Sequence, residues 1–360
     1  MPIPLRERNI THFLSILPLL FLIVYNIFIM DLSIIIISFN TKELTEKCLG
    51  TIFESLNSSV IPAKAGIHGS PIKSGMTNFE VIVLDNNSSD GSVEMLERWS
   101  SGEIEKLRSR GGEIELSRNG NKISFKTIFL KENLGFSRGN NEAVKSATGK
   151  YLLFLNSDTE VLDDAISSLY SFFTSTQNSF QFVGAKLLEK DRTTSQPSAG
   201  HFYTLPVVFA SLYLRGDYYG LTRFSPTTIK KVDWVSGACF MCTKENFEKL
   251  GGFDEKIFMY MEEIDLFYRA CKNGLNVGFY PASQFIHLEG SSSGDRTNPI
   301  LRVYSGFLYF YKKHHSMLQF TTLRSMLQLK AVVAFAIGII INNSYLKRTY
   351  GEAFKITTRN

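Results

Sequence analysis

The sequence lacks three features that mark common classes of ligand-binding protein. It has no long basic run, and its formal net charge over 360 residues is only +5, so it carries no electrostatic footprint of nucleic-acid binding. It contains no GxxxxGK[ST] phosphate-binding loop, and residues 39–42, FNTK, stand where a dinucleotide-binding GxGxxG would follow the first strand. These absences argue against a nucleic-acid-binding protein, a P-loop NTPase and an NAD-dependent oxidoreductase. A mild basic excess suits anionic ligands or an anionic membrane face.

Cysteine is also scarce. Four cysteines in a chain of this length do not form the pattern of a disulfide framework. Cys239 and Cys242 have CxxC spacing, but no second pair accompanies them, so no zinc-binding spacing is present. Both lie in an apolar run, which favours buried free thiols and a reducing compartment.

One long apolar segment lies near the N-terminus. Residues 13–30 are almost wholly apolar and follow Arg6 and Arg8, and their number is about the minimum for a membrane-spanning helix. A signal peptide is disfavoured because no small-residue cleavage site follows, and a third interpretation is that translation starts at Met30. The two arginines favour a cytoplasmic N-terminus, so one span would put the rest of the chain outside. Because that conflicts with the function inferred below, we favour a misassigned start or a segment lying in the membrane interface.

Strand-like and helix-like segments alternate along the first half of the chain. Residues 152–155, LLFL, are a short apolar run bounded by polar turn residues, which is typical of a buried parallel strand. Residues 32–38 and 79–84 share this pattern, and 127–130 is predicted to be a further strand. The alternation predicts an α/β fold whose mostly parallel sheet is covered by helices on both faces. Helices are expected at residues 41–56, 92–99, 141–147, 163–173 and 259–273, and a last strand at 276–280.

Two stretches and the C-terminal region depart from this rhythm. Residues near 60–78 are rich in Gly, Pro and Ser, and residues 100–122 are charged and rich in Gly, so both are predicted to be surface insertions without chemistry. Residues 300–314 and 317–330 are aromatic and basic and are expected to be helical. Residues 331–341, AVVAFAIGIII, are too short to span a bilayer and would form either a buried core helix or a helix lying on a membrane. Their basic flanks and the preceding aromatic belt favour the membrane.

Polar side chains follow the predicted strand at residues 152–155. Open α/β sheets bind ligands at the carboxyl ends of their strands, so Asp158 lies where phosphates and a divalent metal are expected. The alternative is a plain strand-to-helix turn with Asp158 as an N-cap. His287 follows the last predicted strand, and imidazole is a common metal ligand. An Asp oxygen and a His nitrogen would together suit Mn²⁺ or Mg²⁺ completed by phosphate oxygens.

A second group of candidate residues is the acidic cluster at residues 262–265. On a helix, Glu262 and Asp265 share one face while Glu263 points elsewhere. A carboxylate held against apolar neighbours has a raised pKa and can serve as a general base. The alternative is a solvated first turn, where acids interact favourably with the helix dipole. Arg138 lies in a Gly- and Asn-rich turn at residues 133–141 and could pair with a phosphate.

Taken in order, these pieces resemble family 2 glycosyltransferases with the GT-A fold, and in particular their rhamnosyltransferase-like branch. The resemblance covers about residues 31–315. The matching segments are ISFN (37–40), VLDNNSSDG (83–91), residues 133–141, LNSD (155–158), WVSGA (234–238), GGFDE (251–255) and EEIDL (262–266), completed by His287 with Gly290 and Ser292.

The resemblance implies a role for each matching residue on the nucleotide side. Ser38 and Phe39 would line the nucleotide pocket, and Asp85 would hydrogen-bond the base or the ribose. Arg138 and Asn140 would lie beside the nucleotide.

The resemblance also implies a metal site and a sugar site. Residues 156–158 match the family's metal-binding DxD, with Asn156 in place of the first Asp beside the nucleotide sugar. Asp158 would then be the main carboxylate ligand of Mg²⁺ or Mn²⁺, and His287 a further ligand. Trp234 and Gly237 would border the sugar and the acceptor.

The acidic cluster would supply the base. Glu263 stands where the family has its catalytic Asp, and its side chain is one methylene longer. Asp265 is the second candidate for the base. Glu262 would help to bind the nucleotide sugar. The metal and Arg138 would neutralise charge on the leaving diphosphate. Glu263 would take the proton of an acceptor hydroxyl, which would attack the anomeric carbon from the opposite face and invert it.

The resemblance therefore implies an inverting glycosyltransferase of the hexosyltransferase type. It would move a sugar such as rhamnose from a nucleotide-diphosphate sugar to a glycan or polyprenyl-linked glycan, in assembly of O-antigen or cell-wall polysaccharide at the cytoplasmic face of the inner membrane. The expected domains are residues 1–30, a hydrophobic segment; 31–298, the GT-A domain; and 299–360, a membrane-associated helical region. The alternative is a non-catalytic GT-A-like partner in glycan assembly.

Overall fold

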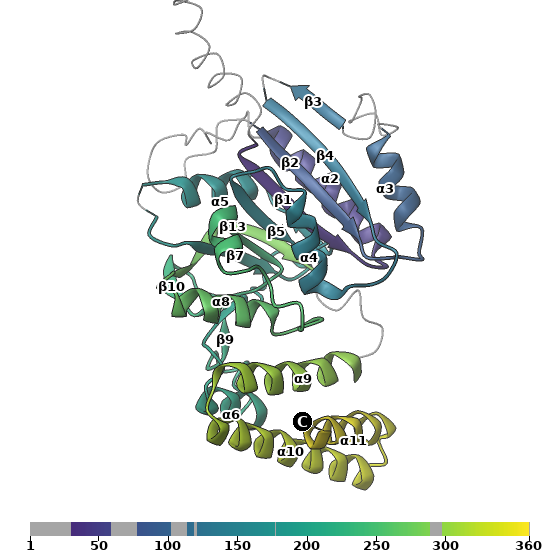
Figure 1. Ribbon diagram of the computed structural model, residues 1–360, viewed down its shortest axis with the longest axis vertical. Helices are drawn as coiled ribbons and strands as arrows, with labels where there is room; N and C mark the ends of the chain where they lie inside the picture. Colours follow the sequence, from purple (N-terminus) through teal and green to yellow (C-terminus); the bar gives the residue numbers. More distant parts are fainter. Residues whose placement is uncertain are drawn as a thin grey trace, which may run out of the picture.

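The structure is a computed structural model that describes residues 30–58, 78–101, 114–118, 121–176, 178–288 and 297–359 (Figure 1). The apolar segment before Met30 and nearly all of the predicted insertion near residues 60–78 lie outside the described residues. The expectations for these two segments therefore stay predictions.

Ten strands of the described chain form one mixed sheet. Its order is β10 (Lys230–Val232), β13 (Val277–His287), β7 (Phe182–Leu188), β12 (Cys239–Thr243), β5 (Tyr151–Leu155), β1 (Leu32–Ser38), β2 (Asn78–Asp85), β4 (Asn121–Phe129) and β3 (Ile114–Arg118), with β6 (Thr159–Val161) paired to β13. The pairs β5–β1–β2–β4 and β7–β13 are parallel. β12 runs antiparallel between β5 and β7. The predicted mostly parallel α/β sheet is confirmed, with antiparallel strands added around β12 and at the edges.

Helices cover both faces of this sheet because its central strands are apolar on both sides. In β1, Ile34 and Ile36 face α2 (Lys42–Ser58), α3 (Ser92–Ser100) and α5 (Ala165–Thr174). Ile35 faces the opposite core, which contains residues of α4 (Gly135–Lys145), α7 (Lys244–Lys249) and α8 (Glu262–Lys272). Every residue of β1 except Ile37 is fully buried. A continuous apolar run in the sequence therefore marks a strand enclosed by helices.

The fourth strand is longer than the sequence pattern indicated. β4 begins at Asn121 rather than near Thr127, because Ile123 and Phe125 alternate into the core on one face. β3 pairs antiparallel with it at the sheet edge. Part of the second predicted insertion is therefore sheet rather than surface loop.

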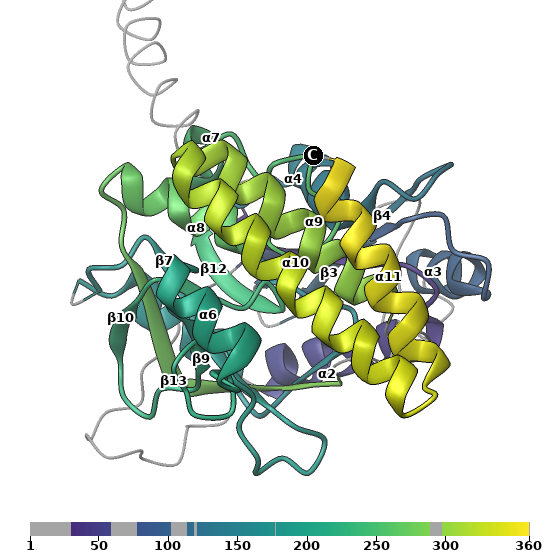
Figure 2. The ribbon, with the colours of Figure 1, turned by 90° about the horizontal axis from the view of Figure 1, so that it is seen from below.

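Three helices form a layer below the sheet domain: α9 (Thr297–His314), α10 (Met317–Ile340) and α11 (Ser344–Arg359), with α6 (Leu205–Tyr213) beside them (Figures 1 and 2). α10 begins at a capping box formed by Ser316 and Gln319. The prediction that residues 331–341 form a separate short segment is wrong. They are the second half of this 24-residue helix.

A small second sheet connects these layers. Its order is β11 (Trp234–Val235), β8 (Ala199–Gly200) and β9 (Arg223–Phe224). The apolar core on the α8 side of the main sheet continues through Trp234 into α9 and α10, where Phe310 and Leu327 are fully buried. The predicted buried thiols are also confirmed, since Cys239 and Cys242 are enclosed in β12.

Candidate active site

The carboxyl ends of β1, β2 and β5 meet at one edge of the sheet. Ser38 and Asp85 are paired in register as the last residues of β1 and β2. Asp85 accepts a hydrogen bond at Oδ1 from the Ser88 amide, 2.9 Å away. Its Oδ2 atom is buried and has no hydrogen-bond partner within the described residues. A buried carboxylate oxygen without a partner is costly, so this atom is suited to accept a hydrogen bond from a ligand.

The loops that follow β1 and β2 are latched together. Asn40, with φ of 52°, donates its backbone N–H to Ser88 Oγ. Its side-chain oxygen accepts a hydrogen bond from the Ser89 backbone N–H. Asp90 accepts from the amides of Lys42 and Ser92, the first residues of α2 and α3. Asn and Asp favour such turns because their side chains bond nearby backbone groups. The latch leaves the Phe39 side chain 39% exposed at the sheet edge.

A chain of hydroxyls joins the β1 edge to the β5 edge. Ser38 Oγ lies 3.2 Å from Thr41 Oγ1, which lies 3.1 Å from Ser157 Oγ. All three side chains are buried. The predicted pocket residue Ser38 and the predicted metal-binding segment are therefore connected through the protein interior.

The structure brings Asp158 and His287 together. β6 pairs antiparallel with β13, His287 opposite Thr159, and the Leu288 amide donates to the Asp158 carbonyl. These ladder contacts bring His287 Nε2 to 3.4 Å from Asp158 Oδ1. Both side chains are nearly buried. One hard oxygen donor and one imidazole nitrogen face each other, as the predicted Mg²⁺ or Mn²⁺ site requires.

This donor pair fits a divalent ion that takes its other ligands from elsewhere. Within the described residues no group of three His, Cys, Asp or Glu side chains could hold a metal by itself. Asn156 contributes a neutral amide, and its backbone N–H is bonded to the Ala238 carbonyl at 3.0 Å. The protein can therefore supply two ligands, and a diphosphate would have to supply others.

The Asn156–Ala238 contact brings the sugar-side turn next to α8. A Cβ atom on Gly237 would lie 3.8 Å from Glu263 Cβ, with Phe136 on its other side. The turn between β11 and β12 thus contacts both Asn156, which follows β5, and Glu263 of α8. The structure therefore unites the strand-end residues with the acidic cluster.

The backbone just before the acidic pair is strained. Tyr260 and Met261 have φ of 69° and 76°, in the left-handed region that residues with bulky side chains avoid. Met261 is also the N-cap residue of α8 and provides no side-chain cap. Such strain is commonly found at functional sites. Here it orients Glu262 and Glu263 at the start of α8.

The two glutamates are partly or fully buried and poorly paired. One oxygen of each, Oε2, is buried without a hydrogen-bond partner within the described residues. Burial, reinforced by the charge of Glu263, raises the pKa of Glu262 well above its usual value. Burial also raises the pKa of Glu263, but the Arg223 guanidinium partly offsets the rise. Two neighbouring acids with unequal environments can hold different protonation states, and Glu263 is the one supported by a cation.

Asp265 has a different environment, although it lies on the same helix turn. Its carboxylate is bound by Arg269 Nε at 2.7 Å, Lys313 Nζ at 2.7 Å and His314 Nε2 at 2.6 Å. Burial alone would raise its pKa, but the His314 hydrogen bond and the charges of Arg269 and Lys313 outweigh it and lower the pKa to about 2. Both of its oxygens are engaged with α8 and α9, so it is poorly suited to accept a proton from a substrate.

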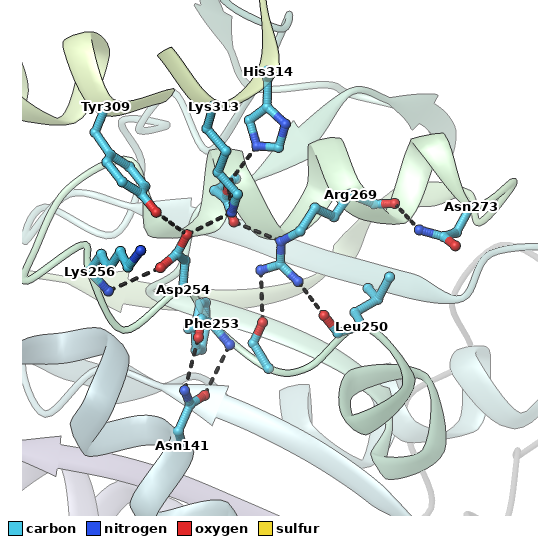
Figure 3. A network of polar contacts seen from close by, with 12 residues as sticks. Asn141, Leu250, Phe253, Asp254, Lys256, Arg269, Asn273, Tyr309, Lys313 and His314 are labelled. Atoms are coloured by element: carbon cyan, nitrogen blue, oxygen red, sulfur yellow. Dashed lines mark hydrogen bonds and ion pairs between the residues drawn. The ribbon is translucent and has the colours of Figure 1, made fainter. Parts of the chain in front are cut away.

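The same network holds the loop at residues 251–255. Lys313 Nζ and Tyr309 Oη contact Asp254 Oδ2, and Arg269 donates to the Gly252 carbonyl (Figure 3). On the other side of the loop, the Asn141 amide makes two hydrogen bonds of 2.9 Å to the Phe253 backbone. The loop is therefore clamped between α4 and α9.

A family model described as glycosyl transferase family 2 matches residues 33–250, more than half of the chain. The chain belongs to glycosyl transferase family 2. A second model, described as the N-terminal domain of galactosyltransferase, matches residues 229–291.

Individual relatives agree with this family 2 membership. The chain is 26% identical over 261 residues to the low-salt glycan biosynthesis hexosyltransferase Agl10 of Haloferax volcanii, covering 71% of this chain and 67% of that protein. It is 27% identical over 160 residues to the rhamnosyltransferase WbbL of Escherichia coli, covering 42% of this chain and 60% of that protein. The chain thus spans about two thirds or less of the length of these relatives. The resemblance to family 2 and to rhamnosyltransferases is confirmed.

One solved structure supports the fold. The chain is similar to a mannosyltransferase from Pyrobaculum calidifontis in complex with GDP-Man and Mn²⁺, with a TM-score of 0.50, 13% identity, and coverage of 91% of this chain and 86% of that one. At this identity the likeness concerns the fold alone. It confirms the predicted GT-A fold.

Three residues predicted from the family 2 pattern have partners inside the protein. Arg138 is half-exposed and lies 3.8 Å from Glu255, its ion-pair partner among the described residues. The Asn140 amide donates to the Phe136 carbonyl of its own helix. Trp234 is buried, and its indole N–H donates to the His201 carbonyl. Their contacts with donor or acceptor stay predictions.

The glycine-rich turn before α4 also serves the protein itself. Gly135 has φ of +78°, and a Cβ there would lie 2.5 Å from the Phe258 carbonyl oxygen. The Leu134, Gly135 and Phe136 amides all donate to protein acceptors. The close approach at this turn is therefore to Phe258.

Three residues at this site were not predicted from the sequence. Gln196 contacts His287, the charge of Arg223 lowers the pKa of Glu263, and Asn141 holds the Phe253 loop. Gln196 and Arg223 lie in segments without strand-like or helix-like periodicity, far in sequence from their partners. Asn141 lay in a matched segment, but nothing in the segment indicated its partner.

We expect Asp265→Asn to lower the free energy of unfolding by about 3–5 kcal/mol, because it leaves buried cations without their anion. The stabilisation from Asp265 should be complete above about pH 4, its range when unfolded, and be lost as the pH falls toward its native pKa of about 2. Urea unfolding across this pH range would measure both effects.

Asp164→Asn is the matched control, because Asp164 is exposed at the start of α5 and makes no side-chain cap. It should change stability by no more than about 0.5 kcal/mol. Equal stability of the two variants would mean that the Asp265 network contributes little.

Proposed function

We propose that this chain is an inverting, metal-dependent glycosyltransferase. It would transfer a sugar such as rhamnose from a nucleotide-diphosphate sugar to a hydroxyl of a glycan or polyprenyl-linked glycan. The observation that carries the proposal is the junction at Asn156 and Ala238. Through it the Asp158–His287 pair and the Gly237–Glu263 pair belong to one site.

The residues at the carboxyl ends of the strands support a proposal for how the nucleotide-sugar donor would bind. Asp85 offers an unpaired carboxylate oxygen to a base or ribose hydroxyl, and Phe39 offers an exposed ring beside it. Asp158 and His287 would hold Mg²⁺ or Mn²⁺, which would stabilise the charge of the leaving diphosphate when bound. Asn156 and Ser38 would complete the wall between nucleotide and sugar.

Glu262 and Glu263 support a proposal for how the acceptor hydroxyl would be activated. Glu263 would take the proton from the attacking hydroxyl, and Arg223 would favour its ionised form. Burial and the charge of Glu263 raise the pKa of Glu262 well above its usual value, and in its protonated form Glu262 could donate a hydrogen bond to a sugar oxygen. Gly237 and Trp234 would border the space between them. General-base help of this kind is typically worth about 10²–10⁴-fold in rate.

We further propose that residues 31–298 form the catalytic domain and residues 299–360 rest on the cytoplasmic face of the inner membrane. Among the described residues, α10 is the one helix long and apolar enough to cross a membrane. It buries the small residues Ala331, Ala334 and Gly338, and a Cβ on Gly338 would lie 2.8 Å from Leu346 Cβ of α11. Because α10 is packed along one side, we propose that it lies on the bilayer. Its exposed apolar residues include Leu329, Val332, Val333, Phe335, Ile337, Ile339 and Ile340.

A second exposed apolar group lies at the same end of the molecule. α6 lies beside α10 in Figures 1 and 2, and Tyr213 of α6 donates to the Met326 carbonyl of α10. Phe209 of α6 is about half-exposed. The residues Leu214, Tyr218, Tyr219 and Leu221, which follow α6, are exposed by half or more. We define the membrane face as these residues together with the exposed residues of α10.

The charge distribution favours an anionic membrane as the partner of this face. Residues 297–360 contain nine of the 39 Lys and Arg residues but one of the 34 Asp and Glu residues. They carry a net charge of +8, whereas the rest of the chain is net −3. Basic residues near an anionic lipid surface contribute about 1 kcal/mol each.

We expect Glu263→Gln to abolish transfer while donor binding survives, because the amide cannot accept the proton. Transfer would be assayed with purified protein and Mn²⁺ against a panel of nucleotide sugars, and donor binding by thermal shift. Glu248→Gln, an exposed substitution on α7, is the control. Near-normal turnover of Glu263→Gln would refute the base assignment. Donor binding without metal-dependent turnover in the wild-type protein would favour a non-catalytic partner.

The acid limb of the pH–rate profile should lie above the usual Glu range, because burial raises the pKa of Glu263 and the base acts only when ionised. Arg223→Gln should move this limb to still higher pH by removing the charge that lowers the pKa. Lys249→Gln removes an exposed charge on α7 and should leave the limb unchanged. A lower-pH shift in Arg223→Gln would contradict the arrangement.

We expect the double variant Val332→Glu, Ile339→Glu to weaken binding to vesicles of phosphatidylglycerol and phosphatidylcholine by roughly 10-fold or more, since each buried side chain contributes about 1.5–3 kcal/mol. Flotation assays would measure it. Phe129→Glu, at the carboxyl end of β4 and outside the membrane face, alters a side chain of similar exposure and should bind normally. Unchanged vesicle binding of the double variant would exclude α10 from the contact.

A further inference from the structure

Gln196 is a buried polar residue whose side chain, in the described part of the chain, makes two hydrogen-bonding contacts with His287. It lies in the segment between β7 and β8 and is 3% exposed. Its backbone amide donates to the Leu187 carbonyl at 2.9 Å, which fixes the segment against β7. A buried amide side chain needs a partner for both its oxygen and its nitrogen, and His287 supplies both.

The two contacts determine which ring nitrogen of His287 carries the proton. Gln196 Nε2 lies 2.7 Å from the His287 carbonyl oxygen, which can only accept, so the amide nitrogen must be the atom on that side. Gln196 Oε1 therefore faces His287 Nδ1, 3.0 Å away. An amide oxygen can only accept. His287 Nδ1 must then carry a hydrogen and donate it.

The opposite ring nitrogen then presents a lone pair to Asp158. In the neutral imidazole, a hydrogen on Nδ1 leaves Nε2 without one. Nε2 and Asp158 Oδ1 are 3.4 Å apart, beyond the usual 2.7–3.2 Å of an N–H···O hydrogen bond. Two electron-rich atoms at this spacing repel each other unless a cation joins them. Without Gln196, Asp158 would favour the other tautomer, with the hydrogen on Nε2 pointing at its carboxylate.

We propose that Gln196 is a positioning residue that holds His287 in the Nδ1–H tautomer and so keeps Nε2 free to bind a divalent cation with Asp158. This proposal rests on the metal dependence in the proposed function. Gln196 touches neither the cation nor the substrate. It acts by preventing the protein's own carboxylate from capturing the ligand nitrogen.

The tautomer can be read directly in the metal-free protein. In protein labelled with ¹⁵N-histidine at a pH where the ring is neutral, the ring shifts of His287, assigned by their loss in His287→Asn, report which nitrogen is protonated. We expect Nδ1–H in the wild-type protein and Nε2–H in Gln196→Met, which is similar in size but cannot accept from Nδ1–H. Gln196→Glu should keep Nδ1–H, because its carboxylate still accepts. Gln181→Met is the control, since the Gln181 side chain binds the Asn276 amide away from the site.

Metal affinity supplies the second measurement. Titration of each protein with Mn²⁺ alone, followed by electron paramagnetic resonance, should give binding weaker by about 10–100-fold in Gln196→Met, the usual range for residues that orient a metal ligand. Gln196→Glu and Gln181→Met should bind far better than Gln196→Met. Circular dichroism and thermal unfolding would verify that each variant is folded.

Three results would overturn the proposal: an Nε2–H tautomer in the wild-type protein, an unchanged tautomer in Gln196→Met, or a changed tautomer with unchanged Mn²⁺ affinity. Absence of Mn²⁺ binding in the wild-type protein would instead refute the metal in the proposed function, and with it the metal half of this proposal. The tautomer measurement would still decide what Gln196 does to His287.

Discussion

The buried carboxylate of Asp265 is the contact on which the shape of the site depends. It receives Arg269 from its own helix and Lys313 and His314 from α9, and Lys313 also reaches Asp254. One charge centre thereby joins α8, the Phe253 loop and the first C-terminal helix. Gly306 of α9 adds a second contact, because a Cβ there would lie 2.8 Å from Met261 Cγ. The strained turn before Glu262 is thus supported by the same helix that neutralises Asp265. The geometry of the candidate base is therefore coupled to the packing of the C-terminal helices.

The acidic residues in the first turn of α8 lie in two different environments, which shift their pKa values in opposite directions. Asp265 is buried, is bonded to Arg269, Lys313 and His314, and is an anion at any ordinary pH. Glu262 and Glu263 are buried with unpaired oxygens and hold their protons more tightly than usual. Removing a compensated charge costs stability, whereas an uncompensated one is available for chemistry. The pattern separates a residue that holds the helix in position from residues that can exchange a proton.

The sequence was sufficient for the fold class and for the strand-end candidates because both depend on local patterns. Apolar runs predicted β1, β2 and β5, and parallel strands bring Ser38, Asp85 and Asp158 to one edge without further information. The antiparallel insertion of β12 depends on long-range pairing, which period and propensity do not encode. The partners of Asp265 were missed for the same reason, since Lys313 and His314 come from another helix. The length of α10 was underestimated because Lys330 interrupts the apolar pattern of the sequence, whereas the helix continues through this residue.

The pairing of Asp158 with His287 depends on the residue count of a single strand. β13 follows β7 in register as far as Tyr280 and resumes at Gln284, so residues 281–283 form a bulge that β7 does not share. Ser283 Oγ fixes this bulge by donating to the Ala165 carbonyl at 2.7 Å. Since side chains alternate along a strand, the bulge decides which face of the sheet His287 lies on. The loss or gain of one residue between Tyr280 and His287 would turn the imidazole to the opposite face of the sheet. The number of residues in this short stretch therefore determines whether His287 can pair with Asp158.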